Sequence, residues 1–347
     1  MMSNKKKGKI FGARLIKTGI AVFLTAKICY VLDLPVVFAV IIAIVTIERT
    51  ASDSIRKGMI RFPAALIGAS LAMTFTFLFG QSPLTYTLAA VFTIFICIKC
   101  KLEAGALIAT ITAVAMISVT YDHYFLTFIE RVGTTIIGLV VSTLVNFFIL
   151  PARFSEVIKQ RNHELYLETA NLLKKRTKEL ITEKKPISKK TQKEYQRITS
   201  ELAKSVQLCH YQREEWKYHR HSTAELRSFI FEKKKLDQLQ QIHYYLGHII
   251  SVHIKENNFT NSQLLLQTID STVEVLKASG NEIPKEHLQN INELDKRFWD
   301  TNDVEQPLEK KYHHHFTSET VILFVILSIH DVLEELERVS RHQIHKV

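Results

Sequence analysis

The sequence predicts an all-α protein in two parts: a six-helix transmembrane domain made of two inverted three-helix repeats, then a cytoplasmic helical bundle. Residues 1–150 contain six long apolar runs and only 6 acidic residues, whereas the rest of the 347-residue chain is highly charged. The apolar part repeats its own pattern about 70 residues later. No segment shows the apolar–polar alternation that is typical of β-strands.

The apolar runs are long enough to suggest membrane crossing. A helix needs about 20 residues, with a range of about 17–25, to cross the hydrocarbon core of a bilayer. The third and sixth runs meet this length comfortably, and the first, fourth and fifth meet it marginally. The second either spans with the help of its flanks or forms half of a re-entrant hairpin. The predicted transmembrane domain covers 1–151, the cytoplasmic domain covers 152–347, and the six runs lie at about 14–32, 34–48, 62–80, 83–99, 104–121 and 131–150.

The charges between the runs predict the orientation. With a cytoplasmic N-terminus, twelve of the fourteen basic residues of the apolar part face the cytoplasm, and only Lys27 and Arg131 lie toward the outside. An excess of Lys and Arg on the cytoplasmic side is the usual orientation signal. Six crossings return the chain to the same side, so both termini are expected in the cytoplasm.

The repeat is visible in two matching stretches, "RFPAALIGAS" from Arg61 and "RVGTTIIGLV" from Arg131. Small residues at four-residue spacing let helix backbones approach closely in a membrane. A unit of three spans is odd, so the second copy must be inverted relative to the first, as in many transporters with a central pathway. The aligned helix-packing residues are Ala64, Gly68 and Ala72 in the first copy and Thr134, Gly138 and Ser142 in the second.

Three cations lie in or beside the spans, namely Lys27, Arg61 and Arg131. A charge at the bilayer centre costs about 2.5–3.5 kcal/mol, so such residues usually face a cavity or the bundle interior. Each could instead anchor its helix at the interface, with Glu48 or Glu130 as a partner for the arginines. The sign of the charge favours an organic anion as the passenger, and these three residues are the candidates for its path.

The sequence lacks the residues that several other classes of function require. No P-loop is present, because Leu139 follows Gly133 and Gly138 where a lysine is required. No paired catalytic groups stand out, so we expect no enzyme and no cofactor. The Cys97–Cys100 pair has no second pair to complete a zinc site, and we expect it to pack as small membrane residues. The balanced charge after residue 152 argues against nucleic-acid binding.

Histidines offer no metal site by spacing alone. The clusters at 219–221 and 312–316, with His243, His248 and His253, are expected to be exposed or in loops, because adjacent histidines on a helix point in different directions. The lysine runs of the same half are expected to be solvated helix faces, with contact to anionic membrane lipids as the alternative.

The charged half predicts helices at about 154–183, 188–255 with a break near 219–223, 260–279, 284–298 and 318–342. Thr260 fits the start of a capping box, and Gly280 ends the same helix. The apolar run 320–329 is too short to span, so it predicts the central helix of a bundle.

These features together resemble a known family. "RFPAALIGA", "ERVGTTIIGLVVSTLVNFFILP" and the closing "ILFVILSIHDVLEELERVS" are similar to the aromatic acid exporter family of Firmicute bacteria, within the fusaric acid resistance group. The resemblance implies a plasma-membrane efflux protein for aromatic or related organic anions, a homodimer, and no catalytic residues. The alternative is a membrane-anchored sensor whose helical tail binds a ligand or partner.

Overall fold

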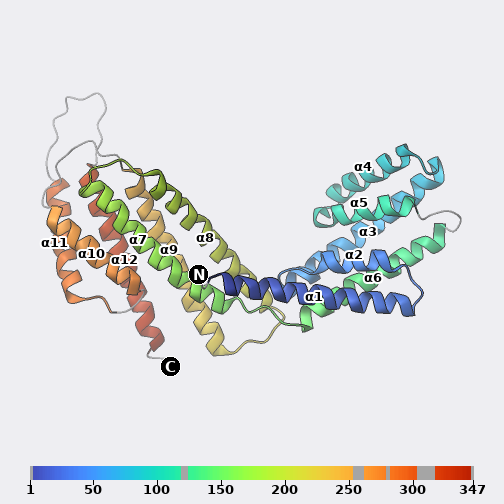
Figure 1. Ribbon diagram of the computed structural model, residues 1–347, viewed down its shortest axis with the longest axis horizontal. Helices are drawn as coiled ribbons and strands as arrows, with labels where there is room; N and C mark the ends of the chain where they lie inside the picture. Colours follow the sequence, from blue (N-terminus) through green and yellow to red (C-terminus); the bar gives the residue numbers. More distant parts are fainter. Residues whose placement is uncertain (1–2, 119–123, 253–261, 279–281, 303–316, 345–347) are drawn as a thin grey trace. The chain divides into compact units, whose positions relative to one another are not determined.

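The structure is a computed structural model that describes residues 3–118, 124–252, 262–278, 282–302 and 317–344 (Figure 1). Every regular element in these ranges is a helix, so the predicted all-α fold is confirmed. The chain divides into two compact units. The N-terminal unit is Met1–Arg153 with Tyr211–Arg220, and the C-terminal unit is Phe154–His210 with His221–Val347.

The helices of the N-terminal unit follow the six apolar runs, but the first, third and sixth begin well before their runs. The third helix begins well before residue 62, because the Thr50 side chain accepts a hydrogen bond from the backbone of Asp53 and caps it there. The sixth begins before residue 131. An apolar run marks only the part of a helix that suits lipid. The helix itself continues into the polar flanking residues when these contain no helix-breaking residue. The helices are α1 (Ser3–Val31), α2 (Val36–Thr46), α3 (Ala51–Phe79), α4 (Pro83–Lys99), α5 (Glu103–Ile117) and α6 (Tyr124–Phe148).

Two of the described helices, Ala51–Phe79 and Phe125–Phe148, are long and apolar enough to cross a membrane by length and composition. They correspond to the third and sixth runs, the two that the sequence places comfortably within the required length. The helices α2, α4 and α5 are apolar but shorter. The number of crossings therefore stays a prediction.

The N-terminal unit has a core of small side chains and a surface of large apolar ones. Its buried clusters consist mainly of alanines, with Cys97 packed against Ala64 and Ala109. Large side chains such as Phe23, Leu107 and Phe125 are exposed. Soluble monomers rarely expose such continuous apolar surface. This distribution suits a unit whose surroundings are themselves apolar.

Packing within the N-terminal unit follows the repeat. The third helix of each repeat packs against the first two helices of the other: α3 contacts α4 and α5, whereas α6 contacts α1 and α2. The two third helices also contact each other. Exchanging the repeats leaves this pattern of neighbours unchanged, so the sequence repeat is also a repeat of packing.

The ends of corresponding helices are also built alike. After α1, the amide of Leu34 donates to the carbonyl of Cys29 at 2.9 Å, and after α4 the amide of Leu102 donates to the carbonyl of Cys97 at 2.8 Å. The residue before each donor, Asp33 or Lys101, has a positive φ. This is the Schellman end of a helix, made twice at an offset of 68 residues.

Corresponding positions after α3 and α6 differ in residue type, but both have a positive φ. Gly80 has φ 63° and Leu150, seventy residues later, has φ 48°. Glycine adopts this left-handed conformation freely, whereas leucine adopts it at a steric cost. The second copy therefore stores strain at a turn that the first copy makes without strain.

Glycine sets the distance between the repeats at two equivalent places. A Cβ on Gly68 would lie 2.3 Å from the carbonyl oxygen of Ala109, and a Cβ on Gly138 would lie 2.5 Å from that of Ala39. Gly68 and Ala109 correspond to Gly138 and Ala39 after exchange of the repeats. At both places the glycine faces the backbone of the neighbouring helix. Any larger residue there must therefore push the two helices apart.

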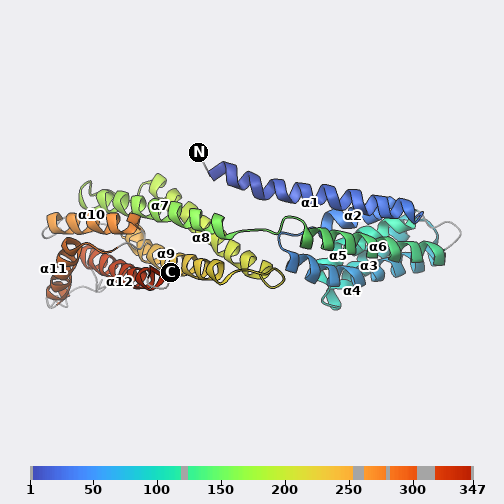
Figure 2. The same cartoon turned by 90° about the horizontal axis from the view of Figure 1, so that it is seen from below.

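The C-terminal unit is a helical bundle in which α12 is central. It packs against α9, α10 and α11, and its apolar run is buried at Ile322, Leu323, Val325 and Ile326, as predicted. A capping box joins Ser222 and Glu225 at the start of α9. The predicted caps Thr260 and Gly280 lie outside the described residues. The helices are α7 (Ser155–Ile181), α8 (Lys189–Glu215), α9 (Thr223–Ser251), α10 (Ser262–Ala278), α11 (Lys285–Asn302) and α12 (Ser318–Ile344) (Figure 2).

We predict that Gly68→Ala and Gly138→Ala each destabilise the N-terminal unit by about 1–3 kcal/mol, the usual cost of overpacking. Thermal unfolding of the purified chain in detergent measures the effect. Gly19→Ala is the matched control, because a Cβ there meets no atom within 4 Å. A midpoint lowered as much by Gly19→Ala as by Gly138→Ala would contradict the close contact.

Candidate functional site

The three cations predicted from the sequence have different surroundings. Lys27, on α1, has an exposed side chain. Arg61 on α3 and Arg131 on α6 are buried, with 8% and 6% of their surface exposed. Their role in a substrate path stays a prediction for all three, but only the two arginines lie inside the unit.

Arg61 is a paired cation. Its Nη2 donates to Oε1 of Glu48 at 2.8 Å, and its Nη1 donates to the carbonyl of Val45 at 3.2 Å. Lys57 also contacts the Glu48 carboxylate, at 3.0 Å. Glu48 therefore shares its negative charge between two cations, and Arg61 holds the end of α2 against α3.

Arg131 lies among α2, α5 and α6 with much less polar contact. Its Nη2 donates to the Thr112 hydroxyl at 3.0 Å, and its guanidinium carbon lies 3.6 Å from the centre of the Phe38 ring. Its Nε and Nη1 atoms are buried and have no hydrogen-bond partner. Within the described ranges, no carboxylate forms an ion pair with it. Such a group is costly unless a further acceptor approaches.

The repeat explains why the two arginines differ. Seventy residues after Glu48 stands Ser118, so the second copy lacks the carboxylate that pairs with Arg61 in the first. The Ser118 hydroxyl donates to the carbonyl of Ala115, within its own helix end. Cation–π contact with Phe38 replaces part of the lost stabilisation but supplies no hydrogen-bond acceptor. Arg131 is thus a buried donor group with two nitrogens, Nε and Nη1, that have no acceptor.

A polar network that the sequence reasoning missed ties α1 and α6 to the start of α3. Lys17 donates to the Asn146 side chain at 2.8 Å, and Asn146 donates in turn to the Ser54 hydroxyl at 2.7 Å and the Thr50 carbonyl at 3.1 Å. All of these side chains are buried. The sequence signal that could have indicated this network is Asn146, because it is a polar amide within an otherwise apolar run.

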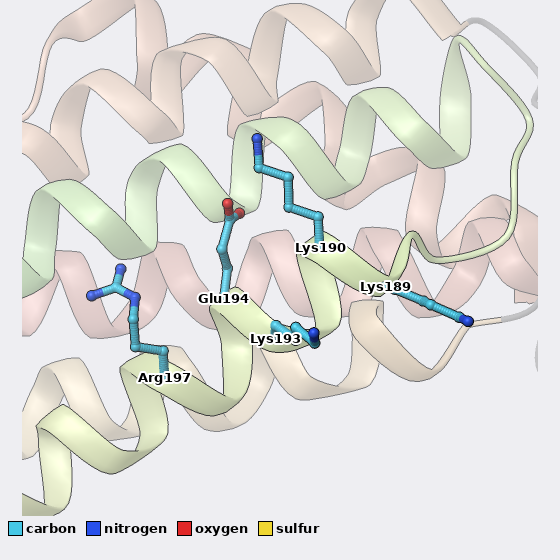
Figure 3. A pocket seen from close by; sticks show the side chains of 5 residues that line it. All are labelled: Lys189, Lys190, Lys193, Glu194 and Arg197. Carbon is cyan, nitrogen blue, oxygen red and sulfur yellow. The ribbon is translucent and has the colours of Figure 1, made fainter.

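Two further hollows are weaker candidates. A groove of about 570 Å³ between α3 and α6 is lined by apolar residues and Thr143 and includes neither buried arginine. A basic pocket of about 410 Å³ lies on α8 (Figure 3). Glu194 there pairs with Lys175, and Arg197 pairs with Glu168. The remaining lining residues are the exposed Lys189, Lys190 and Lys193.

Of the histidines expected to be exposed or in loops, His219 and His221 lie between α8 and α9 as expected, but His243 is buried. His243 stacks on Tyr195, with ring centres 4.3 Å apart, and its burial lowers its pKa to about 4. His253 and residues 312–316 lie outside the described ranges. Within those ranges no group of three or more His, Cys, Asp or Glu residues could hold a metal ion.

A pair of histidines joins α11 to α12. His287 Nε2 lies 3.1 Å from His330 Nδ1, and His287 Nδ1 lies 2.8 Å from the Ser271 hydroxyl. Glu334 lies 3.3 Å from the other nitrogen of His330. Burial, with a smaller contribution from His330, lowers the pKa of His287 to about 4. His287 therefore joins α11 to α12 in its neutral form.

Comparison with known proteins places the whole chain in one family. A family profile described as "Aromatic acid exporter family member 1" matches residues 9–149, which lie in the N-terminal unit. A "UPF0421 protein" of Bacillus cereus is 48% identical over 341 residues, covering 97% of this chain and 96% of that protein. The chain belongs to the aromatic acid exporter family.

More distant relatives also match over most of the length of both chains. A "UPF0421 protein" of Halalkalibacterium halodurans is 36% identical over 94% of this chain and 89% of its own length. One from Staphylococcus haemolyticus is 34% identical over 79% of this chain and 81% of its own length. The predicted resemblance is thus confirmed, and the chain is an all-α membrane protein of an exporter family.

We predict that acid destabilises the C-terminal unit through His287. Its folded pKa of about 4 lies below the ordinary value of about 6.5, so the folded form binds fewer protons than the unfolded form. Stability is complete above pH 6.5 and falls between pH 6.5 and 4, by about 2 kcal/mol at pH 5 from this group alone. Unfolding midpoints at pH 7 and pH 5 should differ less in His287→Gln than in the natural chain. An equal difference between the two midpoints in both proteins would contradict the role of His287.

Proposed function

We propose that the chain exports organic carboxylate anions, with Arg131 as the anion-binding residue. The observation that carries the proposal is the buried guanidinium, of which two nitrogens, Nε and Nη1, lack an acceptor. A carboxylate presents two oxygens in the geometry that a guanidinium matches, and such pairs are the strong hydrogen bonds of proteins. The family and the excess of cations in the N-terminal unit support the same ligand charge.

The surroundings of Arg131 also favour an anion with an aromatic body. Phe38 covers one face of the guanidinium and holds its plane. The helices α2, α5 and α6 consist mainly of apolar residues, so a ring attached to the carboxylate would leave water for a low-polarity environment. An inorganic anion would gain only the contact to Arg131.

The charge pattern supports the proposed membrane topology, and the family supports the proposed direction of transport. We propose a multi-pass plasma-membrane protein with both termini in the cytoplasm, because the basic residues lie on that side in this arrangement. Outward movement follows the family's description as exporters. A homodimer, the state that the resemblance implies, belongs to this proposal as well.

Arg131→Gln should reduce efflux of benzoate from preloaded cells or vesicles at least tenfold, because it removes the charge that the carboxylate meets. Arg131→Lys should retain part of the activity, since it keeps the charge but loses the planar fork. Arg56→Gln removes a cation of the same unit from an exposed position that is not a path candidate, and it should leave the rate within about twofold. Full benzoate efflux by Arg131→Gln would contradict the site.

Cyclohexanecarboxylate separates the two parts of the site, because it has the same carboxylate and a saturated ring. Phe38→Leu should lower benzoate efflux and narrow the difference between the two acids. An unchanged ratio between them would show that the ring of Phe38 contributes nothing to selection.

The proposed orientation predicts opposite accessibility for Lys57, near the start of α3, and for Tyr121, between the fifth and sixth apolar runs of the sequence. In Lys57→Cys and Tyr121→Cys variants, a membrane-impermeant thiol reagent added to intact cells should label only position 121. Labelling both positions after permeabilisation is the control. Labelling of both from the same side would contradict the two inverted repeats.

A further inference from the structure

A short stretch of the charged half of the chain belongs to the N-terminal unit. Tyr211–Arg220 contains the last turn of α8 and the residues that follow it, and the chain on either side of it belongs to the C-terminal unit. Sequence reasoning placed it wholly within the cytoplasmic bundle. Its contacts with the N-terminal unit are polar and specific.

Glu215 bonds two different helix ends at once. One carboxylate oxygen accepts from the amide of Ala51, the first residue of α3, at 2.9 Å. The other accepts from the amide of Ala152, just after α6, at 3.2 Å. The Glu215 side chain is only 2% exposed. A buried carboxylate that accepts two backbone N–H bonds is held strongly, and the positive end of the α3 dipole adds to its attraction.

Neighbouring residues extend the same contact to both helices. Toward α3, Ser52 donates to Glu214 at 2.9 Å, and Arg49 donates to the Tyr211 hydroxyl at 2.9 Å. Toward α6, the His219 Nε2 lies 2.8 Å from the carbonyl of Phe147, and the two rings lie 4.9 Å apart. The segment therefore covers the start of one arginine-bearing helix and the end of the other.

The α6 end that it covers is the strained one. Leu150 has φ 48°, between the Phe147 carbonyl that meets His219 and the Ala152 amide that meets Glu215. A leucine remains in this conformation only when its surroundings hold it there. The contacts of the segment supply such a hold on both sides of Leu150.

We propose that Tyr211–Arg220 is a clasp that restrains transport by holding the cytoplasmic ends of α3 and α6 together. The inference rests on the proposed function. Transport through two inverted repeats requires the pathway to open at each face in turn. Opening at the cytoplasmic face separates the start of α3 from the end of α6, and this breaks the bridge through Glu215. Release of the clasp relieves the strain at Leu150.

The clasp also gives the C-terminal unit a means of control. Because the chain enters and leaves the clasp from that unit, a rearrangement there pulls on Tyr211–Arg220 directly through α8. A ligand or partner that binds the C-terminal unit can thereby change the rate of a site that it does not contact.

The first test is the rate of benzoate efflux from proteoliposomes that contain the full chain. Glu215→Gln keeps an acceptor for one amide but loses the charge and the second bond, so the rate should rise about three- to tenfold. Glu335→Gln is the control, since it removes the same charge from an exposed position of α12 outside the clasp and should leave the rate unchanged. An unchanged or lower rate in a folded Glu215→Gln protein overturns the clasp.

The second test does not depend on that variant folding. In a chain with Ser52→Cys and Glu214→Cys, a short thiosulfonate cross-linker should stop benzoate efflux, and dithiothreitol should restore it. The cross-linker should not change the rate of either single-cysteine variant. Equal rates in the cross-linked and reduced states overturn the proposal.

The controls separate this inference from the proposed function. If the natural chain moves benzoate no faster than Arg131→Gln, the transport assignment fails. If the natural chain transports benzoate and neither Glu215→Gln nor the cross-link changes the rate, the clasp alone fails.

Discussion

Close approach of helix backbones is the constraint on which the N-terminal unit depends. Lipid offers no hydrophobic force between helices, so their association relies on direct contact and on polar bonds. Gly68 against Ala109 and Gly138 against Ala39 provide that contact at two equivalent places. Once these helix pairs are in contact, the large side chains have no space inside and must face outward, which gives the unit its small-residue core.

The two repeats share a backbone plan and differ in charge. Arg61 has Glu48, and the corresponding partner of Arg131 is replaced by Ser118. A perfectly symmetric pair would have neutralised both arginines or left both without a partner. The asymmetry leaves Arg131 without a carboxylate and with two buried nitrogens that lack a partner, whereas Arg61 keeps its ion pair and has one such nitrogen, Nε. The Gly80 and Leu150 turns differ in a similar way, with the strain confined to the second copy.

Much of this architecture was predictable from the sequence because helices and repeats leave local signals. Apolar runs gave the helices, and the offset of about 70 gave the pairs Arg61/Arg131 and Gly68/Gly138. Contacts between distant residues leave no such signal. Nothing near Glu215 distinguishes it from other surface glutamates of a charged helix, and the stacking of Arg131 on Phe38 depends on how three helices cross. The burial of His243 and His287 likewise depends on packing within the bundle.

The exchange of partners between the repeats has a consequence for biosynthesis. The first two helices to leave the ribosome, α1 and α2, pack mainly against α6, the last of the six to be made. Neither half of the unit is a finished domain by itself, and α3 must wait for α4 and α5. The nascent chain therefore holds its polar and small-residue faces unmatched in the lipid until the final apolar segment emerges, and the unit closes only at that moment.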